Sequence, residues 1–221
     1  QHPLKAQVDA LKRVTFQTQL GSQHDKSERV RALVKSITAA IGGDPTLADR
    51  AAVLSKCDLL THMVGEFPEL QGLMGRYYAL HDHEPAEVAE ALREQYLPRF
   101  AGDALPATRT GMALSIADKL DTIAGIYATG QKPTGTRDPF GLRRAALGLL
   151  RTSIERGLDL DLQQLIGQAV AAARDDMARV ATGQGRSLSA IDAEKLAVEV
   201  YDYVLERLRA YYVEGTADIT V

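Results

Sequence analysis

Residues 113–148 read ALSIADKLDTIAGIYATGQKPTGTRDPFGLRRAALG. In the first half of this stretch, apolar residues recur at i, i+3, i+4, i+7, i+10, i+11 and i+14, which is the spacing of one helix face. These residues are Ala113, Ile116, Ala117, Leu120, Ile123, Ala124 and Tyr127. Asp118 and Asp121 lie together beside that face, and Gly130 is expected to end the helix. The stretch therefore predicts a long, largely buried helix that carries two carboxylates.

The second half of the stretch is a basic loop that leads into a basic helix. Lys132 and Arg137 lie among glycine and proline residues, and Asp138-Pro139 is typical of an N-cap followed by a first helical residue. The predicted helix carries Arg143 and Arg144. Cations at a helix start can contact an anion, for which a nucleic-acid phosphate is the natural candidate. From these residues alone, an ordinary solvated loop is an equally good interpretation.

The rest of the chain indicates an all-α class. Helical apolar patterns are separated by glycine and proline, no stretch alternates as a strand would, and no internal repeat occurs. Asp25, with Glu28 three residues later, resembles a capping box that would start the helix containing Val30 and Leu33. We expect a multi-helix bundle.

The composition of the chain excludes several classes of protein. The 221 residues carry a net charge of −3, which argues against a surface that coats nucleic acid but permits a local basic patch. Cys57 is the only cysteine, so no intramolecular disulfide can form, and a reducing compartment is expected. No apolar run approaches the ~20 residues of a membrane span. Because the chain begins at Gln1, we expect it to be part of a longer protein.

Scattered imidazole and carboxylate groups raise the alternative of a metal-dependent phosphohydrolase. The candidate ligands are His24, Asp25, Asp58, His62, Glu66, His81, Asp82, His83, Asp118 and Asp121. Of the residues around Asp58, only His62 and Glu66 follow it at helical spacing, and helix capping or solvation explains most of the others better. Cys57 lies among leucines and is better explained as a small buried residue than as a nucleophile.

Several long phrases resemble one family closely. They are LKRVTFQTQLGSQHDKSERV (11–30), KCDLLTHMVGEFPELQGLMGRYYA (56–79), EQYLPRFAGDALP (94–106) and IADKLDTIAGIYATGQKPTGTRDPFGLRRAALGLLR (116–151). These phrases resemble the β subunit of the bacterial α2β2-type glycyl-tRNA synthetase. The resemblance implies an HD-domain-like multi-helix bundle over residues 1–158, followed by a C-terminal helical extension over residues 159–221.

The resemblance also implies a function. The chain would contribute tRNA binding and subunit scaffolding to a cytoplasmic ligase that joins glycine to tRNA and converts ATP to AMP. The α subunit would hold ATP, Mg and glycine, so this chain alone would have no catalytic residue, cofactor or metal. Its partners would be the α subunit, tRNA-Gly and the remaining domains of the β subunit, with no membrane contact.

For individual residues, the resemblance places a degenerate HD motif at Cys57, Asp58 and Asp118. Cys57 stands where the superfamily has a metal-binding histidine, which would break the ligand set, and Asp118 corresponds to the later aspartate. The best candidates for tRNA phosphate contacts are Lys132, Arg137, Arg143 and Arg144, although packing against another domain is an alternative for the two adjacent arginines. Two rival functions stay open: an active HD-type phosphohydrolase acting on a nucleotide, and a purely structural bridging domain.

Overall fold

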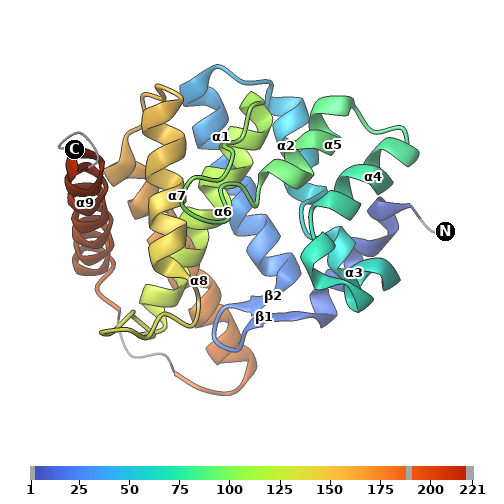
Figure 1. Ribbon diagram of the computed structural model, residues 1–221. Helices are drawn as coiled ribbons and strands as arrows, with labels where there is room; N and C mark the ends of the chain where they lie inside the picture. Colours follow the sequence, from blue (N-terminus) through green and yellow to red (C-terminus); the bar gives the residue numbers. More distant parts are fainter. Residues whose placement is uncertain (1–2, 188–190, 218–221) are drawn as a thin grey trace.

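The computed structural model describes residues 3–187 and 191–217, and most of these lie in helices (Figure 1). The α-helices are α1 (Gln23–Ile41), α2 (Pro45–Leu54), α3 (His62–Glu66), α4 (Leu73–His81), α5 (Ala86–Glu94), α6 (Arg109–Ala128), α7 (Leu142–Glu155), α8 (Leu162–Gly183) and α9 (Ala193–Ala217). The shorter elements are the 3-10 helices η1 (Leu4–Gln7), η2 (Asp9–Arg13), η3 (Cys57–Leu60) and η4 (Pro68–Leu70), and the strands β1 (Thr15–Gln17) and β2 (Gly21–Ser22). The prediction of an all-α bundle is confirmed, with one small antiparallel hairpin that the sequence patterns did not indicate.

Helix α6 lies at the centre of the bundle and packs against α1, α5, α7 and α8 (Figure 1). Its apolar face, including Ile116, Leu120 and Ile123, is fully buried. Other sides of α6 are covered as well, so that Ser115, Lys119 and Asp121 are also buried. Each fully buried Leu or Ile side chain contributes roughly 1.5–3 kcal/mol relative to exposure. Polar residues of α6 must therefore find partners inside the protein.

The N-terminus of α6 is fixed by a buried carboxylate from α5. Glu94 accepts hydrogen bonds from the amide of Ala107 (2.7 Å) and from the hydroxyl of Thr108 (2.5 Å), and it is 1% exposed. Thr108 is the N-cap residue, and its hydroxyl accepts from the amide of Gly111 at 2.9 Å. A Cβ on Gly111 would lie 1.8 Å from a Glu94 carboxylate oxygen. Glycine is thus required where α5 and the first turn of α6 meet.

Helix α7 begins later than the Asp138-Pro139 signal predicted. Its first residue is Leu142, and Gly141 precedes it in the left-handed region with φ +66°. Residues 138–141 form a turn, because the amide of Gly141 donates to the carbonyl of Asp138 at 3.1 Å. The Asp138 carboxylate still satisfies the helix start, since it accepts from the amides of Leu142 (2.8 Å) and Arg143 (2.9 Å). The prediction that Asp138 is the N-cap is wrong, since Gly141 holds that position, but Asp138 does supply the acceptor for the first two helix amides.

Helix α1 also starts at a different residue from the predicted one. Ser22 is the N-cap, and Asp25 is its capping-box partner rather than the cap itself. The amide of Ser22 donates to Asp25 at 2.6 Å, and the Ser22 hydroxyl accepts from the amide of Asp25 at 3.2 Å. The preceding hairpin, in which Thr15 pairs with Ser22, brings the chain to this cap.

The C-terminal helices share the apolar core of the preceding ones. Leu165, Ile166 and Val170 of α8 and Val200 and Val204 of α9 belong to the same buried cluster as the apolar face of α6. Helix α9 lies at one end of the molecule, and α3 and α4 lie at the other (Figure 1). Within the described residues, no helix combines the length and the apolar character needed to cross a membrane. The division at residues 158 and 159 stays a prediction.

Candidate functional site

Three cations and three carboxylates meet beside α6, and we call this group the charge cluster. Its members are Lys26, Arg29, Lys56, Asp118, Asp121 and Asp176. They come from α1, the segment before η3, α6 and α8. The charges of the six residues sum to zero, which is what allows so many ionised groups to be buried together. The cluster joins elements that are distant in the sequence around the central helix.

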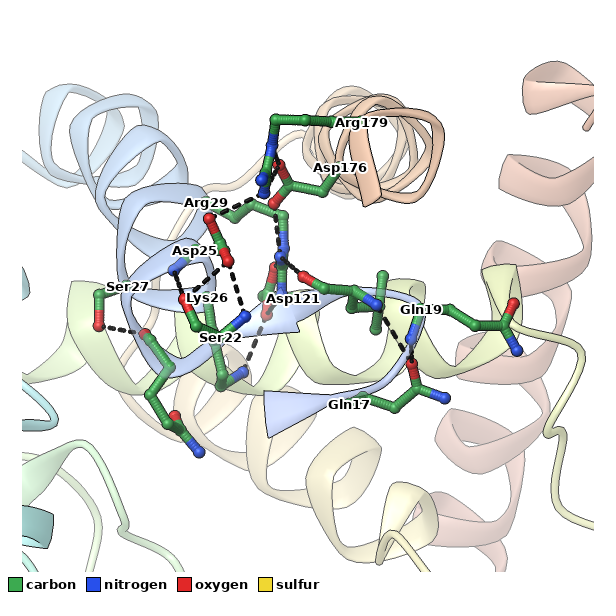
Figure 2. A network of polar contacts seen from close by, with 12 residues as sticks. Gln17, Gln19, Ser22, Asp25, Lys26, Ser27, Arg29, Asp121, Asp176 and Arg179 are labelled. Atoms are coloured by element: carbon green, nitrogen blue, oxygen red, sulfur yellow. Dashed lines mark hydrogen bonds and ion pairs between the residues drawn. The ribbon is translucent and has the colours of Figure 1, made fainter. Parts of the chain in front are cut away.

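Arg29 ties α1 to both α6 and α8 (Figure 2). Its guanidinium donates to Asp121 at 2.7 Å and to Asp176 at 2.7 Å, and it also reaches the carbonyl of Leu20 at 3.0 Å. Burial would lower the pKa of Arg29, but the carboxylates of Asp121 and Asp176 outweigh it and raise that pKa. The side chain is 4% exposed. Arg29 therefore stays charged and holds two helices and the hairpin turn together.

Two ammonium groups converge on Asp118. Lys56 lies 2.9 Å from one carboxylate oxygen, and Lys26 lies 3.4 Å from the same oxygen. Lys26 also donates to Asp121 at 2.9 Å and to the hydroxyl of Thr122 at 2.8 Å. Burial would raise the pKa of Asp118, but the charges of Lys26 and Lys56 outweigh burial and hold that pKa below its ordinary value. Asp118 is therefore an ionised carboxylate that two ammonium groups face.

The structure brings Lys56, rather than its neighbour Cys57, to Asp118. Cys57 is fully buried in the apolar core, and its thiol donates to the carbonyl of Val53 at 3.8 Å. Burial raises the pKa of this thiol to about 12, so it is not a nucleophile at neutral pH. The interpretation of Cys57 as a small buried residue agrees with this position.

Asp58 contacts the start of α4. Its carboxylate accepts from the amides of Gly72 (2.6 Å) and Gly75 (3.2 Å), where it connects η3 to the start of α4. Burial raises the pKa of Asp58, because only part of its charge is compensated by these amides and by Lys56. A Cβ on Gly75 would lie 3.1 Å from this carboxylate, so the glycine allows the close approach. Asp58 thus stabilises a turn.

These residues do not fit an HD-type metal site. Cys57, Asp58 and Asp118 form separate sets of contacts, and the available carboxylate is bound by ammonium groups, which cannot ligate a cation while protonated. Nowhere in the described residues do three His, Cys, Asp or Glu side chains come close enough to hold a metal ion.

The four basic residues predicted to contact RNA fall into two pairs. Lys132 forms an ion pair with Glu199 of α9, and Arg143 donates to the carbonyl of Gly135. Both contacts hold the loop between α6 and α7 in place. Arg137 and Arg144 are exposed, and neither has an ion-pair partner among the described residues. These last two guanidinium groups are the ones available to an external anion.

Sequence analysis missed the cationic half of the charge cluster. The apolar face of α1, which contains Val30 and Leu33, extends backwards by four residues to Lys26 and Arg29. Two cations on the inner face of a helix require buried partners, and this periodicity was the signal that could have identified them. No periodic pattern in the sequence identifies Lys56 as a partner of Asp118, because only the fold shows which residue of the 56–58 segment faces this carboxylate.

Comparisons with known proteins give a consistent result. A family described as the glycyl-tRNA synthetase beta subunit matches residues 1–221. The chain is 50% identical over 211 residues to a glycine–tRNA ligase beta subunit of Ectopseudomonas mendocina, covering 96% of this chain and 29% of that protein. It is 52% identical over 212 residues to the corresponding protein of Hahella chejuensis, covering 96% of this chain and 28% of that protein. The chain therefore spans less than a third of the length of these relatives.

Proposed function

This chain belongs to the glycyl-tRNA synthetase beta subunit family, and we propose that within such a subunit it binds tRNA and scaffolds the assembled enzyme. The names of the relatives supply the reaction, which is the attachment of glycine to tRNA. The word "beta" in those names implies an alpha subunit as a partner. The chain is too short a part of its relatives to carry the whole activity, so we propose that it has no aminoacylation activity alone.

The finer assignments belong to the same proposal. We infer that the chain is an HD-like bundle that no longer binds a catalytic metal ion. We also infer that the whole enzyme is a cytoplasmic heterotetramer, in which the alpha subunit binds ATP, Mg and glycine. The pairing of Asp118 with Lys56 and Lys26 supports the loss of metal chemistry, because both ammonium groups would have to leave before a cation could bind. The family match does not favour the rival phosphohydrolase.

One observation carries the tRNA-binding proposal. Arg137 and Arg144 lie at the surface, on and just after the loop between α6 and α7, without a carboxylate partner in the described part of the chain. Arginine is well suited to phosphate, because its planar fork can donate two parallel hydrogen bonds. Lys132 and Arg143 support the loop on which this surface depends.

The test is binding of tRNA-Gly to the wild-type chain and to a variant with Lys132, Arg137, Arg143 and Arg144 all replaced by Ala. A matched control replaces four exposed cations elsewhere, Lys5, Lys12, Arg13 and Lys35, and so loses the same charge. We expect weaker binding for the first variant only, to a similar degree for tRNAs of different sequence, because phosphate contacts carry no sequence information.

Either of two results would refute this proposal. Equal losses in both variants would mean that only net charge matters. Unchanged binding in both would favour the structural bridging domain. A variant limited to Arg137→Ala and Arg144→Ala separates direct contact from loop support, since it leaves the contacts of Lys132 and Arg143 intact.

A further inference from the structure

A pocket of about 560 Å³, lined by both polar and apolar side chains, opens beside the charge cluster. It lies between η4, the segment after α5, the middle of α6 and the start of α7, and we call it the α6–α7 pocket. The residues that matter for its chemistry are Gln71, Tyr96, Arg99, Asp118, Phe140 and Arg144. Its volume falls within the range of small-molecule sites. It is too small for a nucleic-acid duplex, whose major groove alone is about 12 Å wide.

The electrostatics of the pocket favour an anion. Two carboxylates line it: Asp118 is paired with Lys56 at 2.9 Å, and Glu69 is exposed to solvent, against the three cations Arg99, Lys119 and Arg144. Arg99 donates to the carbonyls of Gln71 (3.0 Å) and Glu69 (3.4 Å), and these carbonyls orient the guanidinium without cancelling its charge. Arg144 has neither an ion pair nor a side-chain hydrogen bond among the described residues. Two guanidinium groups of the lining thus lack a carboxylate partner.

A buried lysine adds to the positive potential without being available as a ligand. Lys119 lines the pocket, and its ammonium donates to the carbonyls of Leu97 (2.8 Å) and Gln95 (3.2 Å) and to the hydroxyl of Ser115 (2.8 Å). All three of its donors are therefore used. Burial lowers the pKa of Lys119 to about 8, so most of its charge remains at neutral pH.

Aromatic rings accompany the guanidinium groups. Phe140 lines the pocket and is 40% exposed, so its ring is available to a ligand. Tyr96 forms a wall, and its hydroxyl accepts from Gln71 at 2.7 Å, which fixes the ring. The Tyr96 ring already lies 4.6 Å from the Lys56 ammonium, so Phe140 is the aromatic ring of the lining that is open to a base. Proteins bind unpaired nucleotides by stacking a base on such a ring and holding the phosphate on a nearby cation.

We propose that the α6–α7 pocket binds a single unpaired nucleotide, with its phosphate on Arg99 and Arg144 and its base against Phe140. This inference rests on the proposed function for its source, an unpaired nucleotide of a tRNA strand. The same chemistry would serve a free nucleoside monophosphate, so the experiment includes both. In the charge cluster, Lys26 and Lys56 pair with Asp118. Because this carboxylate is not free to hold a metal ion, we expect the pocket to bind a nucleotide without hydrolysing it.

The test measures binding of a fluorescent single-stranded RNA hexanucleotide, a hairpin without unpaired ends, and AMP to the 221-residue chain. The variants are Phe140→Leu, which removes the ring but keeps an apolar side chain, and Arg99→Gln, which removes the charge. Their controls are Phe67→Leu, a 50% exposed phenylalanine outside the pocket, and Arg174→Gln, an exposed arginine of α8. Thermal unfolding checks that every variant is folded.

We expect each pocket variant to weaken hexanucleotide binding about tenfold, in line with the loss of one stacked base or one charged contact, while the controls change it less than twofold. Binding of both the hexanucleotide and AMP that is unaffected by both pocket variants would overturn the inference. If that occurs while the four-alanine variant still loses tRNA affinity, the proposed function stands without the pocket. Sensitivity of AMP binding alone would support the pocket chemistry, with a free nucleotide as the source.

Discussion

The ammonium of Lys56 lies 2.9 Å from the carboxylate of Asp118, and both side chains are largely withdrawn from solvent, with exposures of 5% and 15%. Lys56 also donates to the side-chain carbonyl of Gln95 at 2.9 Å, so its charge is held from two sides. This contact connects the segment before η3 to the central helix. Under the proposal of an HD-like bundle, the Lys56 ammonium occupies the carboxylate that would otherwise bind a metal ion.

The pair should be energetically coupled. Lys56→Met keeps the apolar stem but leaves Asp118 with only the more distant Lys26, and we expect it to lower the free energy of unfolding by about 3 kcal/mol, as breaking a buried pair does. Asp118→Asn should cost a similar amount. The double variant should recover part of the loss, with a coupling energy of roughly 1–3 kcal/mol. Urea unfolding of the four proteins measures this, and strictly additive losses would show that the two residues do not interact.

Acid should weaken the charge cluster. Burial would raise the pKa of Asp121, but Lys26 and Arg29 outweigh it and hold that pKa below the ordinary value. The unfolded chain therefore takes up a proton at higher pH than the folded chain does. The stabilisation from Asp121 is complete above about pH 5 and is lost as the pH falls below about 4 toward the folded pKa.

Because the pKa of Asp121 is lower in the folded protein, the effect of Asp121→Asn on the free energy of unfolding should depend on pH. The variant should be less stable than the wild type at pH 7, because Lys26 and Arg29 lose a shared partner. The difference should shrink as the pH falls below about 4, because the unfolded wild type then takes up a proton on Asp121 while the folded protein keeps this carboxylate ionised down to its lower pKa. Thermal unfolding at a series of pH values checks this. A difference that stays constant across the series would mean that the Asp121 charge does not stabilise the fold.

Asp58 should depend on its hydrogen bonds more than on its charge. Asp58→Ala leaves the buried amides of Gly72 and Gly75 without an acceptor, at a cost of about 1–3 kcal/mol for each donor. Asp58→Asn keeps one acceptor oxygen and removes a carboxylate whose pKa is raised by burial. We expect Asn to be tolerated much better than Ala in chemical denaturation. Equal losses would show that the charge itself stabilises the turn.

Cys57 should be inert until the protein unfolds. Its exposure is 0%, and burial raises the pKa of its thiol to about 12. We expect iodoacetamide at pH 8 to label Cys57 at the rate of unfolding, and rapidly in concentrated urea. Mass spectrometry of the intact chain gives the labelled fraction over time. Fast labelling under native conditions would contradict the burial of this thiol.

Sequence reasoning predicted the framework of the fold better than its polar interior. The apolar periodicity of 113–127 identified α6, because a central helix must present matching apolar residues to its neighbours. The pattern Asp138-Pro139 predicts an N-cap at Asp138, whereas α7 starts after the left-handed turn at Gly141, which a local pattern does not determine. Helix starts are set by the conformation of the whole turn as well as by the capping side chain.

The candidate site was predicted only in part for a related reason. Asp118 and Asp121 were recognised as a pair, whereas their partners Lys26, Arg29 and Lys56 come from segments far away in the chain. Long-range ion pairs follow from packing and leave little trace in a single sequence. The residues expected to contact RNA could be chosen by charge, but only the fold separates Arg137 and Arg144, which face outward, from Lys132 and Arg143, which brace the loop.

The most direct test of the account is the salt dependence of tRNA-Gly binding to this chain, with the metal content of the same sample determined by mass spectrometry. We predict that the logarithm of the binding constant falls linearly with the logarithm of the salt concentration, without stoichiometric metal, and that Arg137→Ala with Arg144→Ala reduces the slope by about one unit or less for each lost phosphate contact. Stoichiometric metal without affinity for tRNA would contradict the proposed tRNA-binding function and would favour the metal-dependent phosphohydrolase.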